Sequence, residues 1–495
     1  MQSTQFIALD FGAGSGRVIL ATIGETIQLD EIHRFPNHQV KIGSTYHWDV
    51  LRLYTDAVQG LRMAHEKLTG SLAGIAVDTW GVDFGLLDKH GALVANPVCY
   101  RDARTNGMMK KVFERISQTD IYRATGIQFM QLNTLLQLAS LVESNNPTLE
   151  IADRMLFMPD LISHFLTGKA GGEYTIASTS QMLNATTRQW DASIFEALHL
   201  PINIMPSIQE PGTIRGQLLP DIANETGLGN VDVIASASHD TAAAVAAVPA
   251  QANKWAYLSS GTWSLIGIET DQPIITTASA AYNFTNEGGV NHSIRFLRNV
   301  MGMWLLERCI RQWEQEGKKY NYNELLQLAQ TAPPFQTFIN PDDSSFLNPP
   351  NMVEEIRQYC LQHKQKAPET VGEIIRTILE SLAFRYRWVL EKIEEMQGNR
   401  LEVLHIVGGG SQNDILNQFT ANATGCTVLA GPVEATALGN VLVQALSKNV
   451  IGSLQEGRAL IAKSFPLMKF EPTDTEIWDN QYQRIKSLLE IRMTS

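Results

Sequence analysis

The sequence predicts an α/β protein with two domains, and three of its features support this prediction. The chain has 495 residues, more than one hydrophobic core usually organises, so two large domains are expected. An apolar run, a turn of small residues and a second β-rich run occur at residues 6–23 and again at 255–268, which is weak evidence for a duplicated architecture. Residues 401–430 follow the order strand, loop, helix, strand, which is typical of α/β domains.

The first half of the chain begins with a predicted hairpin. Residues 6–9 and 18–23 have the composition of strands, and the glycine-rich segment 11–16 between them has that of a turn. Residues 84–94 predict a second hairpin, in which Lys89-His90-Gly91 forms the turn. Both hairpins place short strands near the start of the chain, as expected for a sheet-containing N-terminal domain.

The second half contains the clearest helix. Thr370 and Glu373 form a capping box, apolar residues then recur every three or four positions, and Gly398 is a plausible C-terminal stop. Prolines and polar residues dominate residues 331–351, which we therefore expect to form a surface loop. A small-residue helix is predicted at 241–248 and the domain boundary directly after it, giving an N-terminal domain of residues 1–248 and a C-terminal domain of residues 249–495.

Charge and composition exclude several classes of function. The net charge of −12 argues against a nucleic-acid or anionic-membrane partner, because neither is attracted to such a surface. The first residues lack a basic segment followed by an apolar one, and no apolar run approaches the ~20 residues of a membrane span. The four cysteines form no CxxC pair, so we expect reduced thiols rather than disulfides or a zinc site. Together these features predict a cytoplasmic protein.

The glycine-rich turn is the first candidate for chemistry. It runs from Asp10 to Arg17, and its three glycines allow positive φ values and close approach of a ligand to the backbone. Successive N–H groups in such a turn can bind an anion, and Arg17 can add a charged hydrogen bond to a phosphate oxygen. Asp10 could hold a hydrated Mg²⁺. A plain hairpin turn with a surface arginine explains the same residues, and no Walker A motif is present.

A second candidate is Ser238-His239-Asp240-Thr241, which follows an apolar run. At a junction between strand and helix, the Asp240 carboxylate can accept the proton of a substrate hydroxyl as its oxygen attacks a γ-phosphate. The alternative is structural, since an aspartate before T-A-A-A-V also caps a helix. His239 is equally consistent with a satisfied polar residue beside it.

The strongest local pattern is Gly408-Gly409-Gly410, between a predicted strand and the helix 414–424. Three glycines remove every side chain where a base or ribose could lie against the backbone, and the helix N-terminus favours negative charge nearby. The alternative is a flexible connection, but flexibility alone does not require this placement. The sequence therefore predicts a nucleotide contact here.

Two further segments are consistent with either a functional or a purely structural role. Asp78, Trp80 and Asp83 crowd a strand end, where carboxylates and an aromatic wall are typical of sugar sites; a core tryptophan with solvated aspartates is the alternative. Asn299 and Glu307 are predicted on one side of a helix, which taken alone is a generic amphipathic pattern.

With these residues in view, the chain resembles the FGGY carbohydrate kinases over about residues 6–446. The resemblance rests on the segments IALDFGAGSGRVIL, GIAVDTWGVDFGLLD, ASHDTAAAVAAVP, LSSGTWSLIG, RNVMGMWLLER and IVGGGSQNDILNQFTANATG followed by GPVEATALGN. The glycine turn and GGGSQN are general to the family, whereas DTWGVDF, HDTAAAV and RNVMGMWLLER are similar to its rhamnulose-phosphorylating branch. No motif position departs from the pattern of an active enzyme.

The resemblance implies two actin-like (ribonuclease-H-like) domains flanking an ATP cleft. It implies ATP with Mg²⁺ and a ketose, L-rhamnulose, as partners, in a monomer or small homo-oligomer. The residues it assigns to ATP are Ala13, Gly14, Ser15, Gly16, Arg17, Thr262, Glu307 and Gly409. Those it assigns to the sugar are Gly81, His239, Asp240, Thr241 and Asn299. Asp240 would be the general base, and Asp10 would reach Mg²⁺ through water.

Overall fold

The computed structural model describes residues 3–251 and 254–490. The described chain folds into two compact units. Of the described residues, the first contains 3–249, 269–296 and 435–465, and the second contains 250–251, 254–268, 297–434 and 466–490. The chain thus returns twice to the first unit after leaving it, and the division predicted after residue 248 stays a prediction. No helix among the described residues is long and apolar enough to cross a bilayer.

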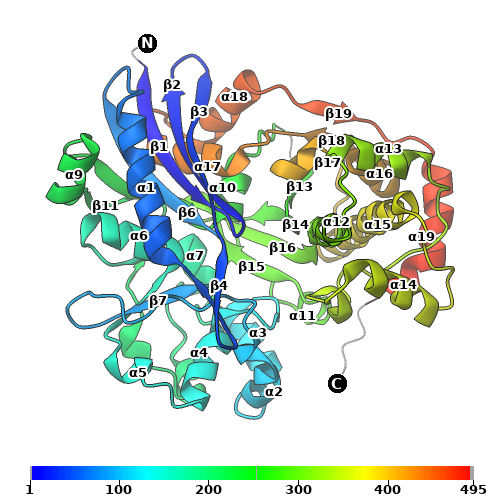
Figure 1. Cartoon of the computed structure of the whole chain (residues 1–495), viewed down its shortest axis with the longest axis horizontal. Helices are drawn as coiled ribbons and strands as arrows, with labels where there is room; N and C mark the ends of the chain where they lie inside the picture. Colours follow the sequence, from blue (N-terminus) through cyan, green and yellow to red (C-terminus); the bar gives the residue numbers. More distant parts are fainter. Residues whose placement is uncertain (1–2, 252–253, 491–495) are drawn as a thin grey trace. The chain divides into compact units, whose positions relative to one another are not determined.

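The first unit is built on a six-stranded mixed sheet of order β11-β12-β6-β1-β2-β3. The predicted hairpin is confirmed as β1 (Thr4–Phe11) and β2 (Ser15–Ile23), which pair antiparallel, and β3 (Ile27–Pro36) extends it. On its other side β1 pairs in parallel with β6 (Leu72–Thr79). Figure 1 shows α1 (Val50–His65) running alongside the β1–β3 strands.

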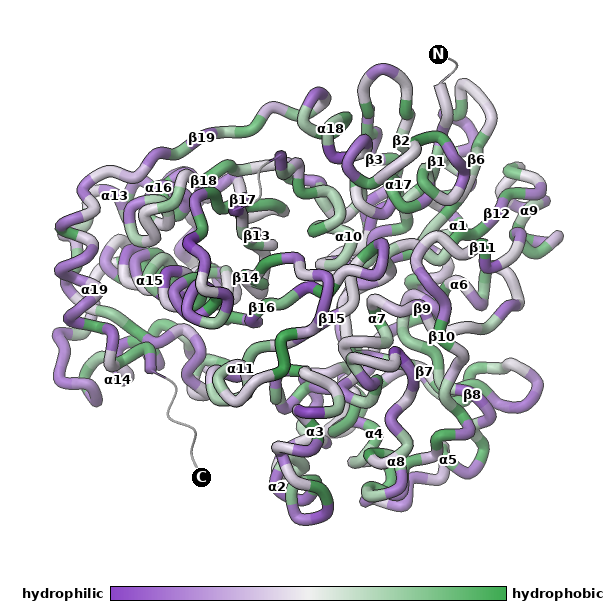
Figure 2. Tube along the Cα trace, turned by 180° about the vertical axis from the view of Figure 1, so that it is seen from behind, coloured by the Kyte–Doolittle hydropathy of each residue, from purple (hydrophilic) through white to green (hydrophobic). Residues whose placement is uncertain are grey.

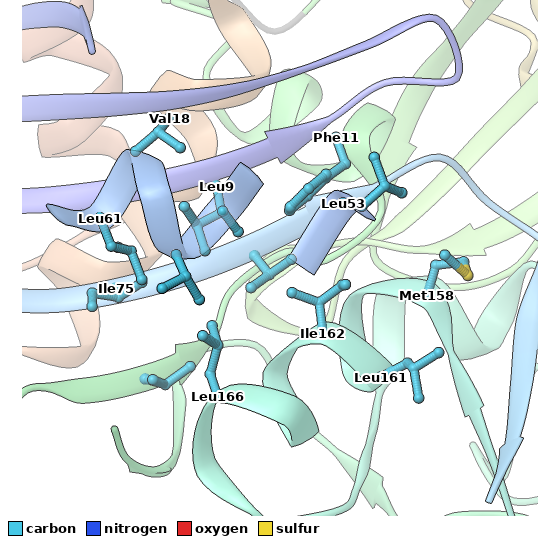
Figure 3. Close-up of a cluster of buried hydrophobic side chains, with 14 of the residues drawn as sticks. Leu9, Phe11, Val18, Leu53, Leu61, Ile75, Met158, Leu161, Ile162 and Leu166 are labelled. Atoms are coloured by element: carbon cyan, nitrogen blue, oxygen red, sulfur yellow. The ribbon is translucent and has the colours of Figure 1, made fainter. Parts of the chain in front are cut away.

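One face of this sheet carries the main hydrophobic core of the first unit. Alternate residues of β1, namely Ile7, Leu9 and Phe11, point to this face, as the two-residue period of a strand requires. They meet side chains of α1 and of α6 (Met158–Thr167), and Figure 3 shows Leu9 and Phe11 among side chains of these two helices. The apolar area removed from water here is the principal stabilising contribution to the unit.

Two other helices pack together in the same unit. α10 (Asp240–Ala246) meets α17 (Ala435–Ser447) so closely that a Cβ on Gly439 would lie 1.7 Å from the carbonyl oxygen of Ala243. From α17, Gln444 donates a hydrogen bond of 3.0 Å to the carbonyl of Ile7 on β1. Buried polar contacts of this kind fix α10 relative to the ends of the central strands.

The second unit repeats the pattern of hairpin followed by parallel strands. β13 (Trp255–Ser260) pairs antiparallel with β14 (Trp263–Thr270) and parallel with β17 (Val403–Val407), which pairs in parallel with β18 (Thr427–Ala430). The predicted helix is α15 (Val371–Gln397), and both bonds of its capping box are present. The predicted strand–loop–helix–strand segment and the similarity of the two halves are therefore confirmed.

The outer helices of the second unit show the expected division into apolar and polar faces. In α19 (Thr475–Leu489) the buried residues are Trp478, Tyr482, Ile485 and Leu489, spaced by three or four positions. Figure 2 shows hydrophilic residues between them. This stripe is the normal pattern of a helix that packs one face on a core.

One local prediction holds in part and another is wrong. The predicted turn at residues 89–91 is present: the Asp88 N–H donates to the Ala92 carbonyl and the Val94 N–H to the Leu86 carbonyl, both at 2.9 Å, on either side of an antiparallel bridge between Leu87 and Leu93. Residues 92–94 do not form an extended strand, however, and β7 (Phe84–Leu87) also pairs with β8 (Arg154–Phe157). The second prediction is wrong. The segment 331–351 is not simply a surface loop, because Phe338, Ile339 and Phe346 are at most 1% exposed. Its apolar side chains anchor an irregular segment to the core, which a count of prolines and polar residues does not detect.

Candidate functional site

Asp240 stands at the start of α10, beyond the end of β12 (Asp232–Ala235). The segment between them runs beside β6, since the Thr79 N–H donates to the Ser238 carbonyl and Thr79 bridges to His239. The N-cap residue is His239, which makes no side-chain capping bond, so the helix-cap alternative for Asp240 is wrong. Asp240 is the first helical residue, and its carboxyl lies at the positive end of the helix.

The two oxygens of the Asp240 carboxyl have different surroundings. Both hydrogen bonds that the carboxyl accepts end on Oδ1, from the Thr241 backbone N–H (2.6 Å) and the Thr241 hydroxyl (3.2 Å). The side chain is 33% exposed, and neither of these bonds ends on Oδ2. Burial raises the pKa of Asp240 to about 7, while the Thr241 N–H opposes the shift and the negative charge of Asp10 adds to it. Such a carboxyl is suited to exchange a proton near neutral pH.

His239 is buried beside this carboxyl. Its Nε2 lies 3.2 Å from Asp240 Oδ1, and its Nδ1 lies 3.1 Å from the Arg295 guanidinium. Burial, followed by the charge of Arg295, holds the pKa of His239 well below its usual range. The imidazole is therefore neutral at physiological pH, which favours a hydrogen-bonding role over a charged one.

A carboxylate missed by sequence reasoning holds this segment in place. Glu173, at the start of α7 (Tyr174–Ser178), is fully buried and accepts hydrogen bonds from Thr175, Ile176 and the Ser238 N–H, the last at 3.1 Å. The Thr175 hydroxyl in turn accepts from the His239 N–H at 3.2 Å. Glu173 thus caps one helix and fixes the backbone that leads into another.

The glycine turn between β1 and β2 is a tight hairpin, but its glycines do not have the positive φ values that were expected. At position 16 a glycine is required by packing instead, because a Cβ there would lie 2.2 Å from the Phe35 ring. A Cβ on Gly14 would meet no atom within 4 Å. Arg17 forms an ion pair with Asp10 across the hairpin. The roles of residues 13–17 at ATP, and of Asp10 at a metal, stay predictions.

Three carboxyls gather near the ends of β1, β6 and α10. Asp10 and Asp78 are register partners on the parallel pair β1–β6. Burial and then the charge of Asp10 raise the pKa of Asp78 well above its usual range, Asp240 adds to the effect, and the Asn440 amide opposes it through a 2.6 Å bond. The charges of Asp10 and Asp240 both raise the pKa of Asp78, which indicates that the three carboxyls lie close together.

The DTWGVDF segment forms the bend after β6. Gly81 is close to the site, since a Cβ there would lie 3.3 Å from His239 Nε2. Val82 has a φ of 68°, a strained value for a β-branched residue, and the Thr134 hydroxyl donates to its carbonyl at 2.7 Å. Trp80 is 5% exposed and donates to Asp83, which is fully buried, so the alternative of solvated aspartates is wrong.

In the second unit the structure brings two predicted ATP residues together. The Thr262 hydroxyl, in the turn between β13 and β14, donates to Glu307 Oε1 on α12 (Trp304–Gln315) at 3.2 Å. Asn299 lies on β16 (Ile294–Met301), a strand. The prediction that Asn299 and Glu307 share one side of a helix is therefore wrong, because Gly302 separates a strand from a helix at that point.

The three glycines after β17 are each constrained differently. Gly408 has a φ of 85°, a Cβ on Gly410 would lie 2.0 Å from Ser260 Oγ, and Gly409 has nothing within 4 Å of its Cβ position. Residues 409–412 form one turn of 3₁₀-helix rather than an open loop, and α16 (Asp414–Thr424) follows. The flexible-connection alternative is wrong: the segment is packed on β13, and only Gly409 presents bare backbone.

Models of one protein family match both halves of the chain. The N-terminal domain of the FGGY family of carbohydrate kinases matches residues 5–247, and the C-terminal domain of the same family matches residues 256–447. The chain belongs to the FGGY family of carbohydrate kinases.

Curated relatives in this family match almost the whole chain. A rhamnulokinase of Bacteroides thetaiotaomicron is 47% identical over 483 residues, which cover 97% of this chain and 99% of that protein. A rhamnulokinase of Oceanobacillus iheyensis is 40% identical and covers 95% and 99%, respectively. The substrates of this kinase are therefore ATP and a sugar.

Solved structures support the fold. A gluconate kinase from Lactobacillus acidophilus superposes with a TM-score of 0.81 at 16% identity, covering 99% of both chains. A xylulose kinase from the same organism gives 0.80 at 17% identity, covering 98% of this chain and 97% of that one. At such low identity these neighbours establish the two-domain, actin-like architecture alone.

Kinases of this family use ATP, generally with a divalent metal, and the residues of the first unit fit a hydrated cation. Asp78 Oδ1 is buried without a hydrogen-bond partner within residues 3–251 and 254–490, and it lies in the mutually repelling set with Asp10 and Asp240. A nearby cation would relieve that repulsion. In the same described ranges, no cluster of three or more acidic, histidine or cysteine side chains is arranged to ligate a metal directly.

Proposed function

We propose that this kinase transfers the γ-phosphoryl group of ATP to the O1 hydroxyl of L-rhamnulose, giving L-rhamnulose 1-phosphate and ADP. The observation that carries the proposal is the 40–47% identity to rhamnulokinases over nearly the whole chain. The DTWGVDF and HDTAAAV segments, which adjoin Asp240, support the same choice of sugar.

Asp240 is proposed as the general base. Its Oδ2 takes the proton of O1 as the O1–Pγ bond forms and the bond from Pγ to the β-phosphate oxygen breaks, releasing ADP. A positioned base contributes on the order of 10² to 10⁴-fold to the rate. We assign the sugar to Gly81, His239, Asp240, Thr241 and Asn299.

The nucleotide is assigned to residues 13–17, Thr262, Glu307 and Gly409. Mg²⁺ bound with ATP supplies neutralisation of the phosphate oxygens, and we propose that Asp10 holds it through water. Arg17 forms an ion pair with Asp10, so the residue assigned to the phosphates and the residue assigned to the hydrated metal are neighbours. We place the enzyme in the cytoplasm, where ATP is available and where its four buried cysteines, all free, would stay reduced.

A panel of ketoses tested by coupled ADP release examines the choice of sugar. We expect the highest kcat/KM with L-rhamnulose, and a preference for L-fuculose or another ketose would reject that assignment. Mass spectrometry of the sugar after incubation with MgATP separates a kinase from a sugar sensor that transfers no phosphate. Asp240→Asn is expected to lower kcat by at least ~10²-fold with the ATP KM nearly unchanged, and near-normal turnover would reject the base assignment.

A further inference from the structure

A buried chain of polar side chains stands behind the proposed base. Glu287 lies on β15 (Thr285–Gly288), Arg295 lies on β16, and His239 precedes α10. All three belong to the first unit, and all are buried, with Arg295 at 0% exposure. No role assigned so far uses Glu287 or Arg295. A buried charge is costly unless its partners are well placed, so these contacts need an explanation.

The Arg295 guanidinium is oriented from two sides. Its Nε donates to the Gly288 carbonyl at 2.9 Å, and its Nη2 forms an ion pair with Glu287 Oε2 at 3.1 Å. The same Nη2 lies 3.1 Å from His239 Nδ1. Because a guanidinium has only donors, this contact requires Nδ1 to carry a lone pair rather than a proton.

The opposite tautomer fits less well. It would place a proton on His239 Nδ1 to be donated to Glu287 Oε2, but these atoms are 3.6 Å apart, beyond hydrogen-bond distance. It would also direct the N–H of His239 Nδ1 at the N–H of Arg295 Nη2, 3.1 Å away. A neutral imidazole has a single ring proton, so with Nδ1 as acceptor the proton is on Nε2, which lies 3.2 Å from Asp240 Oδ1.

We propose that Arg295, held by Glu287, is a positioning residue that fixes His239 as the Nε2–H tautomer and so keeps an N–H donor facing Asp240 Oδ1. Its nitrogen lies 3.2 Å from the oxygen that accepts both Thr241 hydrogen bonds. The carboxyl is thereby held in one orientation, with Oδ2 presented to the hydroxyl that loses its proton. The inference rests on the proposed role of Asp240 as base.

The tautomer can be measured without activity. We would label histidine with ¹⁵N, record long-range proton–nitrogen spectra of the full-length protein, and assign the His239 ring by its loss in His239→Gln. The expected spectrum has a protonated Nε2 and an unprotonated Nδ1. An Nδ1–H tautomer, or a doubly protonated ring at pH 7.5, overturns the proposal even if the enzyme is fully active.

Kinetics separate positioning from general structural damage. Arg295→Met is expected to lower kcat for the sugar by roughly 10- to 100-fold while the ATP KM stays within about twofold. Arg385→Met in the second unit is the matched control, because Arg385 is also 0% exposed and ion-paired, with Asp342 at 2.6 Å; it is expected to lower Tm without this selective loss of kcat. Wild-type kcat in Arg295→Met overturns the proposal.

A double-mutant cycle gives the sharpest test. In His239→Gln the amide NH₂ can occupy the place of Nε2–H and needs no partner to set a tautomer. Adding Arg295→Met to His239→Gln is therefore expected to change kcat by less than about twofold, whereas multiplied losses would mean that Arg295 acts elsewhere. If Arg295→Met does not fold, Glu287→Gln replaces it in the cycle and the wild-type spectrum still decides. If no ketose is phosphorylated, the proposed function fails while the tautomer remains measurable.

Discussion

The pH dependence of the reaction follows from the surroundings of one carboxyl. Burial raises the pKa of Asp240 to about 7, compared with an ordinary aspartate pKa of about 3.9. A base must be unprotonated to accept the proton of the sugar hydroxyl, so activity is present above this pKa and is lost as pH falls through it. The perturbation is therefore a change of pH alone, in the unmodified enzyme.

The size of the effect can be worked out directly. With a pKa of about 7, roughly nine-tenths of Asp240 is unprotonated at pH 8, about half at pH 7 and roughly one-tenth at pH 6. The kcat/KM for the sugar should therefore fall about 10-fold between pH 8 and pH 6. An aspartate with its ordinary pKa would lose almost nothing over the same range.

The assay is coupled ADP release at saturating MgATP, with kcat/KM for the sugar measured from pH 5.5 to 9. The ratio reports groups of the free enzyme and sugar. Glu173 needs separate control because burial also raises its pKa, to about 7. In Glu173→Gln the acid limb should remain at the same pH, since this variant leaves Asp240 in place. His239 does not contribute a limb there, because its pKa is held well below its usual range.

Two results would refute the reasoning. A kcat/KM that stays flat down to pH 5.5, in enzyme that remains folded by circular dichroism, would show that no base titrates near neutrality. A limb that disappears in Glu173→Gln would show that the observed proton binds Glu173 rather than Asp240. Either outcome would separate the elevated pKa from the phosphoryl-transfer step.

Three further predictions concern stability and nucleotide binding. Asp240→Asn should raise Tm, because the folded pKa of Asp240 lies above its unfolded value and the charged form therefore opposes folding. The gain in Tm should be largest above pH 7 and shrink towards pH 4, whereas the control Asp30→Asn, at an exposed position, should show no such trend. A gain in Tm that is independent of pH would contradict this linkage. Gly410→Ala should lower the free energy of unfolding by about 1–3 kcal/mol, since its Cβ would overlap Ser260 Oγ. Gly409→Ala should change the free energy of unfolding by less than about 0.5 kcal/mol. Equal losses of unfolding free energy in the two variants, measured by urea denaturation, would refute this prediction. Gly409→Val should raise the ATP KM, because a side chain would fill the one bare surface of the turn, and an unchanged KM would remove Gly409 from the nucleotide site.

Patterns that are local in sequence predicted the structure best. The first hairpin, α15 with its cap at Thr370, and the segment from β17 to β18 were all predicted, since each depends on periodicity, capping or turn residues within a short window. The errors have a common origin. Residues 331–351 are held by buried Phe338, Ile339 and Phe346, and the additional pairing of β7 with β8, some 70 residues further along the chain, was not predicted. Tertiary contacts decided both, and no local pattern reports them.

The same distinction applies to the site. Asp240 and His239 could be singled out because they stand in one tetrapeptide, and the glycine turns because their composition is unusual. Glu173, Glu287 and Arg295 could not, since each is an ordinary charged residue in its own segment. Glu173 becomes significant only through its hydrogen bond from the Ser238 N–H, and Glu287 and Arg295 only when the chain brings residues 269–296 back to the first unit. A carboxylate fixed by local sequence acquires its orientation and its pKa from residues that are distant in sequence. We therefore expect substitutions at Glu287 and Arg295 to change how well Asp240 performs as a base more than they change nucleotide binding.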